Sequence, residues 1–327
     1  MKRRILVLSA LTMTSLLLSA CGGTSTATPA SVPPASTVGT SDAAPTTAPV
    51  SGGRKVVVSS KDFTEEFLLG EMYALALENA GVPVERKLNL GGSDIAQAAM
   101  VKGGADSGID LYPEYTSTGL TVILGADPIY DPPAVFDAVK KGYEDKFKFT
   151  WLDAAPMNDT QAFVMSKANS DKLGIKSLAD MCAKGADVRV ATTAEFRDRP
   201  DAYPRLVEVY GKCDFKEMKP MASNLFYTTL LNGDVEITQA YSTDGPIAGN
   251  GLVLLADPKN YGLPYNVAPV VRDDVLAMYP QITTALNAIA PKLTNDVIST
   301  LNWEVDGKKR EYADVAKEWM KKEGLIK

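Results

Sequence analysis

Hydrophobic and polar positions between residues 55 and 115 alternate with two different periods. Apolar residues in 61–81 recur at helical spacing, for example Leu68, Met72 and Leu75, and Gly81 ends the pattern. The spacing predicts strands over 55–60, 82–90 and 108–115, with helices over 61–81 and 91–104 between them. A strand–helix–strand–helix–strand order indicates an α/β domain with a largely parallel sheet.

The same rhythm restarts after about residue 156. Strand-like runs cover 161–166, 188–193, 215–220 and 235–242, and helical patterns cover 177–185, 203–211 and 227–233. Apolar runs at 251–260 and 266–274 follow, and the remainder is mostly helical. We therefore predict an α/β fold of two lobes around a ligand cleft, with lobe 1 formed by 54–156 plus 264–327 and lobe 2 by 157–263.

The stretch DLYPEYTSTGL, residues 110–120, ends a strand with tyrosines and three consecutive hydroxyl residues. A buried core has little use for such a run. Ligands of α/β folds bind beyond the carboxyl ends of strands, where loops supply polar groups. We therefore expect a ligand pocket at this strand end.

The first residues are typical of bacterial export. A basic head, MKRR, precedes a short apolar stretch that stops at small residues, which predicts a signal peptide over 1–20. The string LLSAC resembles the lipobox of bacterial lipoproteins and implies lipid attachment at Cys21; an ordinary signal peptide with a chance cysteine is the alternative. Residues 22–53 are almost all Gly, Ser, Thr, Ala, Pro and Val, so we predict a disordered tether over 21–53 and an extracytoplasmic protein anchored to the membrane by lipid.

Composition excludes several functions. The charges of the body, residues 54–327, are mixed and modestly acidic without a basic run, which argues against nucleic acid binding. The chain has no histidine, which removes the commonest general base and zinc ligand, and it has no P-loop or GxSxG motif. We therefore expect no enzyme activity, no metal and no cofactor. Cys182 and Cys213 are predicted to form a disulfide rather than a metal or catalytic site, because exported proteins favour disulfides.

Several motifs resemble one known family. They are SSKDFTEEFLLGEMYALALENAG, LNLGGSDIAQAAMVKGGADSGIDLYPEYTST, AYSTDGPI, PYNVAPVVRDDVL and VDGKKREYADVAKEWMKKEGL. The chain resembles the substrate-binding proteins of ABC importers for quaternary-ammonium solutes (glycine betaine, choline, carnitine and proline betaine) over 55–327. The resemblance implies two α/β lobes joined by a hinge, the type II periplasmic-binding fold. It also implies a monomeric receptor that delivers its ligand to a permease driven by a cytoplasmic ATPase.

The chemistry of such ligands suits the tyrosines. A trimethylammonium group offers no N–H, so aromatic faces hold it, at about 0.5–2 kcal/mol per cation–π contact. By resemblance, Tyr115, Tyr241 and Tyr265 form walls of a cage, and Asp159 lies near the cation. The resemblance also gives a ligand carboxylate its donors, namely Lys61, Thr118 and Arg199.

The chain departs from the family pattern at Gln161, where a fourth aromatic is usual. The amide is either a neutral replacement or the sign of a larger, more polar ligand, such as ergothioneine or carnitine. Without the family, Tyr241 and Tyr265 would be interpreted as packing residues, and Lys61 and Arg199 as surface charges. A sensor lipoprotein that keeps the binding fold without transport stays open as an alternative.

Overall fold

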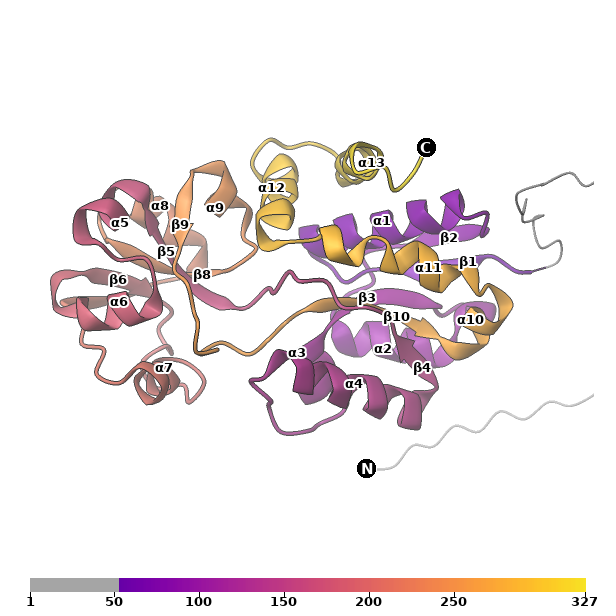
Figure 1. Cartoon of the computed structure of the whole chain (residues 1–327), viewed down its shortest axis with the longest axis horizontal. Helices are drawn as coiled ribbons and strands as arrows, with labels where there is room; N and C mark the ends of the chain where they lie inside the picture. The colour runs from indigo at the N-terminus through magenta and orange to yellow at the C-terminus, as the bar shows by residue number, and fades with distance from the viewer. Residues whose placement is uncertain (1–52) are drawn as a thin grey trace, which may run out of the picture. The chain divides into compact units, whose positions relative to one another are not determined.

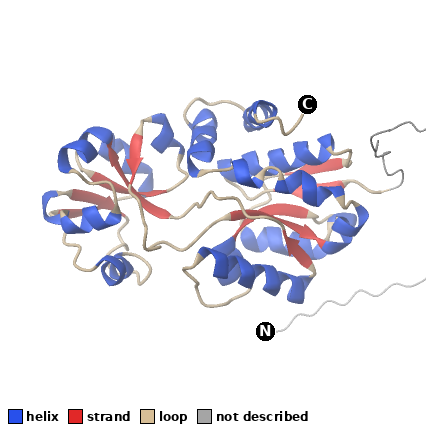
Figure 2. Ribbon diagram, viewed as in Figure 1, coloured by secondary structure: helices blue, strands red, loops and turns tan. Residues whose placement is uncertain are grey.

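Two five-stranded sheets form the framework of the protein in the computed structural model, which describes residues 53–327 (Figure 1). Each sheet is flanked by helices (Figure 2), and we call the part built on the first sheet lobe 1 and the other lobe 2. The predicted two-lobed α/β fold is thereby confirmed. The predicted signal peptide, the lipid site at Cys21 and all of the predicted tether except Gly53 lie outside the described residues.

Lobe 1 has the strand order β2-β1-β3-β10-β4. Its strands are β1 Val56–Ser59, β2 Val84–Lys87, β3 Leu111–Tyr115, β4 Phe149–Trp151 and β10 Val267–Arg272. Its helices in the first half of the chain are α1 Thr64–Asn79, α2 Ser93–Lys102, the turn α3 Thr116–Thr118, the π-helical turn η2 Gly119–Ile123 and α4 Pro132–Phe147. The C-terminal helices are α10 Asp273–Met278, α11 Gln281–Asn287, α12 Asn295–Asp306 and α13 Tyr312–Lys322.

Lobe 2 has the strand order β7-β6-β8-β5-β9. Its strands are β5 Gln161–Ser166, β6 Arg189–Thr192, β7 Glu217–Pro220, β8 Ile237–Tyr241 and β9 Leu252–Leu254. Its helices are α5 Lys167–Leu173, α6 Leu178–Ala183, α7 Tyr203–Tyr210, α8 Phe226–Leu231 and the short α9 Gly245–Gly249. A disulfide joins Cys182 in α6 to Cys213, which precedes β7.

The sheets bury side chains on both faces. In β1, Val56 and Val58 belong to the core shared with α1, whereas Val57 belongs to the core on the opposite face with α2 and α4. Successive side chains of a strand point to opposite faces, so an uninterrupted apolar run such as VVV is what a doubly covered strand requires.

The sheets are largely parallel, as predicted, but each contains one strand that is antiparallel to both neighbours. These strands are β10 in lobe 1 and β5 in lobe 2. Each is the first strand after the chain crosses from the other lobe. A strand that enters its sheet from the cleft side must run away from the cleft, opposite to strands such as β3 and β8, which end there.

The sequence analysis missed two helices of seven or more residues, α4 and α5, besides the short α3 and α9. α4 begins at Asp131, whose carboxylate accepts a hydrogen bond from the Ala134 N–H, with prolines at its first two positions. α5 begins at Ser166, whose hydroxyl accepts from the Asn169 N–H. Both starts carry ordinary N-capping residues, so a search for caps would have found them. No helix within 53–327 has the length and apolarity needed to cross a membrane.

Two chain segments connect the lobes side by side. Asn158 and Asn266 form an isolated antiparallel bridge, the Tyr265 N–H donates to Asn158 Oδ1 at 2.7 Å, and Asn266 Nδ2 donates to the Met157 carbonyl at 2.9 Å. Asn295, at the start of α12, donates from Nδ2 to the carbonyls of Asn158 and Ser242. Side-chain amides therefore tie the two crossing segments together. These segments are residues 152–160, between β4 and β5, and residues 255–266, between β9 and β10, and we call the pair the hinge.

Candidate functional site

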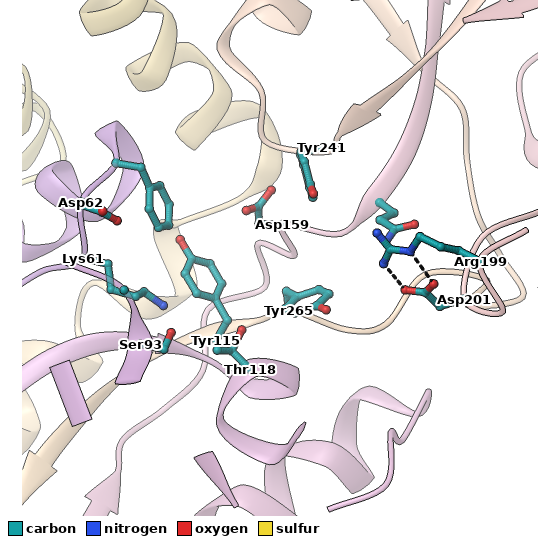
Figure 3. Close-up of a pocket in the computed structure, with 13 residues that line it drawn as sticks. Lys61, Asp62, Ser93, Tyr115, Thr118, Asp159, Arg199, Asp201, Tyr241 and Tyr265 are labelled. Atoms are coloured by element: carbon teal, nitrogen blue, oxygen red, sulfur yellow. Dashed lines mark hydrogen bonds and ion pairs between the residues drawn. The ribbon is translucent and has the colours of Figure 1, made fainter. Parts of the chain in front are cut away.

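One cavity of about 390 Å³ gathers all eight predicted ligand residues, and we call it the cleft cavity. Lobe 1 contributes Lys61, Tyr115 and Thr118, lobe 2 contributes Gln161, Arg199 and Tyr241, and the hinge contributes Asp159 and Tyr265. Figure 3 shows Tyr115, Tyr241 and Tyr265 around an open space, with Asp159 directed toward it. The fold brings these residues together, and their roles in binding stay predictions.

Tyr115 ends β3, as the strand-end argument required, and its ring is fixed on the lobe 1 side. Its hydroxyl donates to Glu65 Oε1 at 2.7 Å, and Lys61 Nζ lies 4.4 Å from the ring centroid. The side chain is only 4% exposed. A phenol held at its hydroxyl end keeps its ring stiff, so the ring can present a surface to a ligand without ordering cost.

Tyr241 differs from Tyr115 in being accessible. It ends β8 opposite Gln161 of β5 and is 55% exposed. Large aromatic side chains are mostly buried in folded proteins, so an aromatic ring exposed to this extent is unusual. An exposed ring that lines a cavity across from two other tyrosines is suited to be covered by a ligand.

The hydroxyl run after Tyr115 serves two purposes, which corrects the expectation that the whole run lines a pocket. The Thr116 and Ser117 hydroxyls are buried and both donate to the carbonyl of Pro264, at 2.8 and 2.7 Å. Only Thr118 reaches the cleft cavity. The first two residues anchor the hinge, because a buried carbonyl in an irregular segment needs a donor.

Lys61 is a buried cation with two partners rather than a solvated surface charge. Its Nζ lies 2.7 Å from Glu114 Oε1 and 3.4 Å from Glu66 Oε1, and the residue is 4% exposed. Burial opposes its charge, but the two carboxylates outweigh burial and hold the pKa of Lys61 above its ordinary value. Its charge is therefore largely neutralised before any ligand arrives.

Arg199 is likewise paired. Its Nε and Nη2 donate to the two oxygens of Asp201, at 2.9 and 2.6 Å, a bidentate contact visible in Figure 3. The hydrogen bonds to Arg199 hold the pKa of Asp201 below its ordinary value. The planar pair fixes the guanidinium at the edge of the cleft cavity.

Two carboxylates near the tyrosines lack a comparable cation. Burial, together with the nearby Glu65 charge, raises the pKa of Asp159 well above its ordinary value, although the Thr243 hydroxyl donates to Asp159 Oδ1 at 2.6 Å. Burial also raises the pKa of Glu65, which accepts from Tyr115 and from Asn302 Nδ2. A ligand cation placed here would relieve both costs, because an opposite charge favours the ionised carboxylates.

Sequence reasoning missed five further residues of this cavity: Asp62, Phe63, Gly92, Ser93 and Asp201. Phe63 is a fourth aromatic, 40% exposed, with its ring centroid 6.2 Å from that of Tyr115. Its position two residues after Lys61 in the motif SSKDF was the available signal. Gly92 and Ser93 open α2, so the positive end of that helix faces the cavity.

Metal ligation has no support in the described part of the chain. Among residues 53–327, no group of three or more Cys, Asp and Glu side chains is arranged to hold a metal ion. The arrangement of rings, carboxylates and hydroxyls is suited to bind a small organic cation or zwitterion.

Comparisons with known proteins agree on one family. Residues 54–322 match the family model OpuAC, described as the substrate binding domain of ABC-type glycine betaine transport systems. The carnitine transport binding protein OpuCC of Listeria monocytogenes is 31% identical over 261 residues, which cover 79% of this chain and 83% of that protein. The glycine betaine-binding protein YehZ of Escherichia coli is 31% identical over 290 residues, which cover 85% of this chain and 94% of that protein.

A solved structure of a glycine betaine/carnitine/choline ABC transporter superimposes with a TM-score of 0.78 at 28% identity. The superposition covers 84% of this chain and 100% of the other. The predicted resemblance is confirmed.

Proposed function

Because this chain belongs to the family of substrate-binding domains of ABC-type glycine betaine transport systems, we propose that it is an extracytoplasmic receptor for a quaternary-ammonium compound such as glycine betaine or choline. One observation carries the proposal. Three tyrosines and Asp159, which are far apart in the sequence, line one cavity between the lobes.

The cation end of the ligand lies among Tyr115, Tyr241 and Tyr265, with Phe63 beside them. Methyl groups that share a positive charge are attracted to ring faces at about 0.5–2 kcal/mol each. Asp159 and Glu65 supply the charge that balances the ammonium. A micromolar receptor needs about 8 kcal/mol in total, which three or four rings and a charge contact on a preorganised cleft can supply.

The carboxylate end of a betaine lies toward α2. Three kinds of donor are available there: the first N–H groups of α2, the Ser93 hydroxyl and the Thr118 hydroxyl. Among the described residues, no carboxylate accepts a hydrogen bond from them. Lys61 and Arg199 add positive charge at the edges, although each is paired with carboxylates of the protein. Choline, which lacks a carboxylate, would use the cation end alone.

The ligand bridges both lobes in this proposal and so favours their closed arrangement over an open one. The closed receptor would then dock on a permease powered by a cytoplasmic ATPase. Lipid on Cys21 and the following tether would keep the receptor, a monomer, at the outer face of the membrane. The receptor carries out no chemical reaction itself. We retain the lobe boundaries 54–156 plus 264–327 and 157–263 as part of the proposal.

The test is a calorimetric titration series in which only methylation changes. Choline is compared with dimethylethanolamine and ethanolamine, and glycine betaine with dimethylglycine and glycine. We expect the trimethylated member of each series to bind at least tenfold more tightly than the less methylated members. The reason is that N–H groups gain more from hydrogen bonds to water than from contact with ring faces. Equal binding of ethanolamine and choline would contradict a cage for quaternary amines.

A further inference from the structure

Another cavity, of about 590 Å³, shares residues with the cleft cavity and is lined mainly by lobe 2, with Asp306 from α12 of lobe 1; we call it the arm cavity. It sits at the carboxyl ends of three parallel strands. Thr193 follows β6, Ser223 and Asn224 follow β7, and Gln239 lies near the end of β8. Strand ends of this kind are where open α/β sheets place their ligands.

The two cavities share walls. Gln161, Arg199 and Tyr241 line both of them. Arg199 is held in place by its two hydrogen bonds to Asp201. Gln161 and Tyr241 are the other shared residues, and an amide at position 161 leaves more room between the two cavities than an aromatic ring would.

The lining of the arm cavity favours a neutral, hydrogen-bonding group. Gln239 Oε1 accepts from the Thr193 N–H at 2.6 Å, which fixes the amide, while its Nε2 donates to no other group in the described part of the chain. Ser223 and Asn224 add a hydroxyl and an amide. Nearby apolar surface comes from Phe226.

The charges that line the arm cavity disfavour an anionic group. Glu195, Asp244 and Asp306 line the arm cavity, whereas Arg199 is its one cationic side chain among the described residues and is already paired with Asp201. A carboxylate placed there would meet three like charges. A neutral polar group avoids that repulsion and can still accept a hydrogen bond from Gln239 Nε2.

We propose that the preferred ligand carries, besides its trimethylammonium head, a neutral polar arm that passes Gln161 and ends against Gln239 in the arm cavity. This inference rests on the proposed function, because the head must occupy the tyrosine cage for the arm to reach lobe 2.

The test uses four betaines that share one head and differ only in the arm: N,N,N-trimethylalanine, N,N,N-trimethylglutamine, N,N,N-trimethylleucine and N,N,N-trimethylglutamate. We expect the glutamine derivative to bind at least about tenfold more tightly than the other three in calorimetry, the gain from two hydrogen bonds to a partly buried amide. The ratio of affinities for the glutamine and alanine derivatives should fall to about one in Gln239→Leu and in Gln161→Tyr.

Matched controls separate the possible failures. Asn250→Ala, an exposed amide in lobe 2, should keep the parent ratio, and thermal unfolding of each ligand-free variant shows whether it folds. The inference is overturned if the alanine, leucine or glutamate derivative binds as tightly as the glutamine derivative, or if neither Gln239→Leu nor Gln161→Tyr lowers the ratio. If choline and glycine betaine bind while the arm has no effect, the proposed function survives this failure; if no quaternary amine binds, the proposed function itself fails.

Discussion

At the scale of single residues, the candidate site combines aromatic surface with carboxylates that are costly to ionise. Tyr115 is fixed by Glu65, whereas Tyr241 is open to solvent. Glu65 is buried and Asp159 half-buried, and both have pKa values above their ordinary ranges. A cation bound in the cleft would favour the ionised form of both carboxylates.

Replacing each of Tyr115, Tyr241 and Tyr265 by alanine should weaken binding of choline or glycine betaine about tenfold, the size of one good cation–π contact. Isothermal titration calorimetry measures the loss. Tyr241→Phe and Tyr265→Phe retain the ring face and serve as matched controls that should bind like the parent. Alanine variants that all bind like the parent would show that these rings are not the cage.

Affinity for a quaternary amine should fall as the pH is lowered through the raised pKa of Asp159. A bound cation lowers that pKa, so below it the ligand must displace a proton, and the affinity declines by up to about tenfold per pH unit. Asp159→Asn should weaken binding at neutral pH by about tenfold or more and flatten the pH profile. Titrations in buffers of different ionisation enthalpy would detect the released proton, and a parent profile that stays flat from pH 4 to 8 would refute the coupling.

At the scale of elements, strand ends and helix starts meet at the cleft. β3 and β8 end there with Tyr115 and Tyr241, and α2 begins there with Ser93. The hinge carries Asp159 and Tyr265, so residues proposed to contact the ligand lie on the segments that would bend. In the proposed function, binding and lobe movement would therefore be coupled through the same few residues.

The disulfide between Cys182 and Cys213 should stabilise lobe 2 without affecting the cleft. It closes a loop over a sequence separation of 31 residues, and neither cysteine lines the cleft cavity. Loop-closure entropy predicts that Cys182→Ser with Cys213→Ser costs roughly 3–4 kcal/mol of unfolding free energy. Chemical denaturation measures the unfolding free energy, with dithiothreitol-treated parent protein as a second comparison. An unchanged unfolding free energy in the double variant would argue against a stabilising role. A large loss of ligand affinity in the folded variant would show that the disulfide also affects the cleft.

At the scale of the whole molecule, the ligand is expected to act as a bridge. Lobe 1 supplies Tyr115 and lobe 2 supplies Tyr241, so only an arrangement that brings both to the ligand gains both contacts. The permease would then distinguish loaded from empty receptors by the relative position of the lobes.

Saturating ligand should make the protein more compact in small-angle X-ray scattering and raise its unfolding free energy by about 2.7 kcal/mol at a concentration of 100 Kd. Tyr241→Ala should need a correspondingly higher ligand concentration for the same compaction. Ethanolamine at the same concentration is the control. Scattering that does not change at saturation would mean that the ligand binds without bridging the lobes.

The sequence by itself determined the fold class, the family and most of the elements, because these depend on local periodicity and on motifs that are contiguous in the chain. Apolar runs such as VVV in β1 require burial on both faces, and the strand-end tyrosine at position 115 indicated where a ligand would lie. The same local evidence missed α4, whose start depends on a cap at Asp131.

Only the tertiary structure decided which charges are free and which are already paired. Lys61 meets Glu114 from β3 and Arg199 meets Asp201, while Glu65, which fits the first turn of a helix equally well, turns out to hold Tyr115. Residues distant in the chain also decide three further features. They are the direction of β5 and β10, the hydrogen bonds of Thr116 and Ser117 to the hinge, and the place of Gln161 in the lining of two cavities. Such pairings are set by the path of the backbone between lobes, which no local pattern encodes.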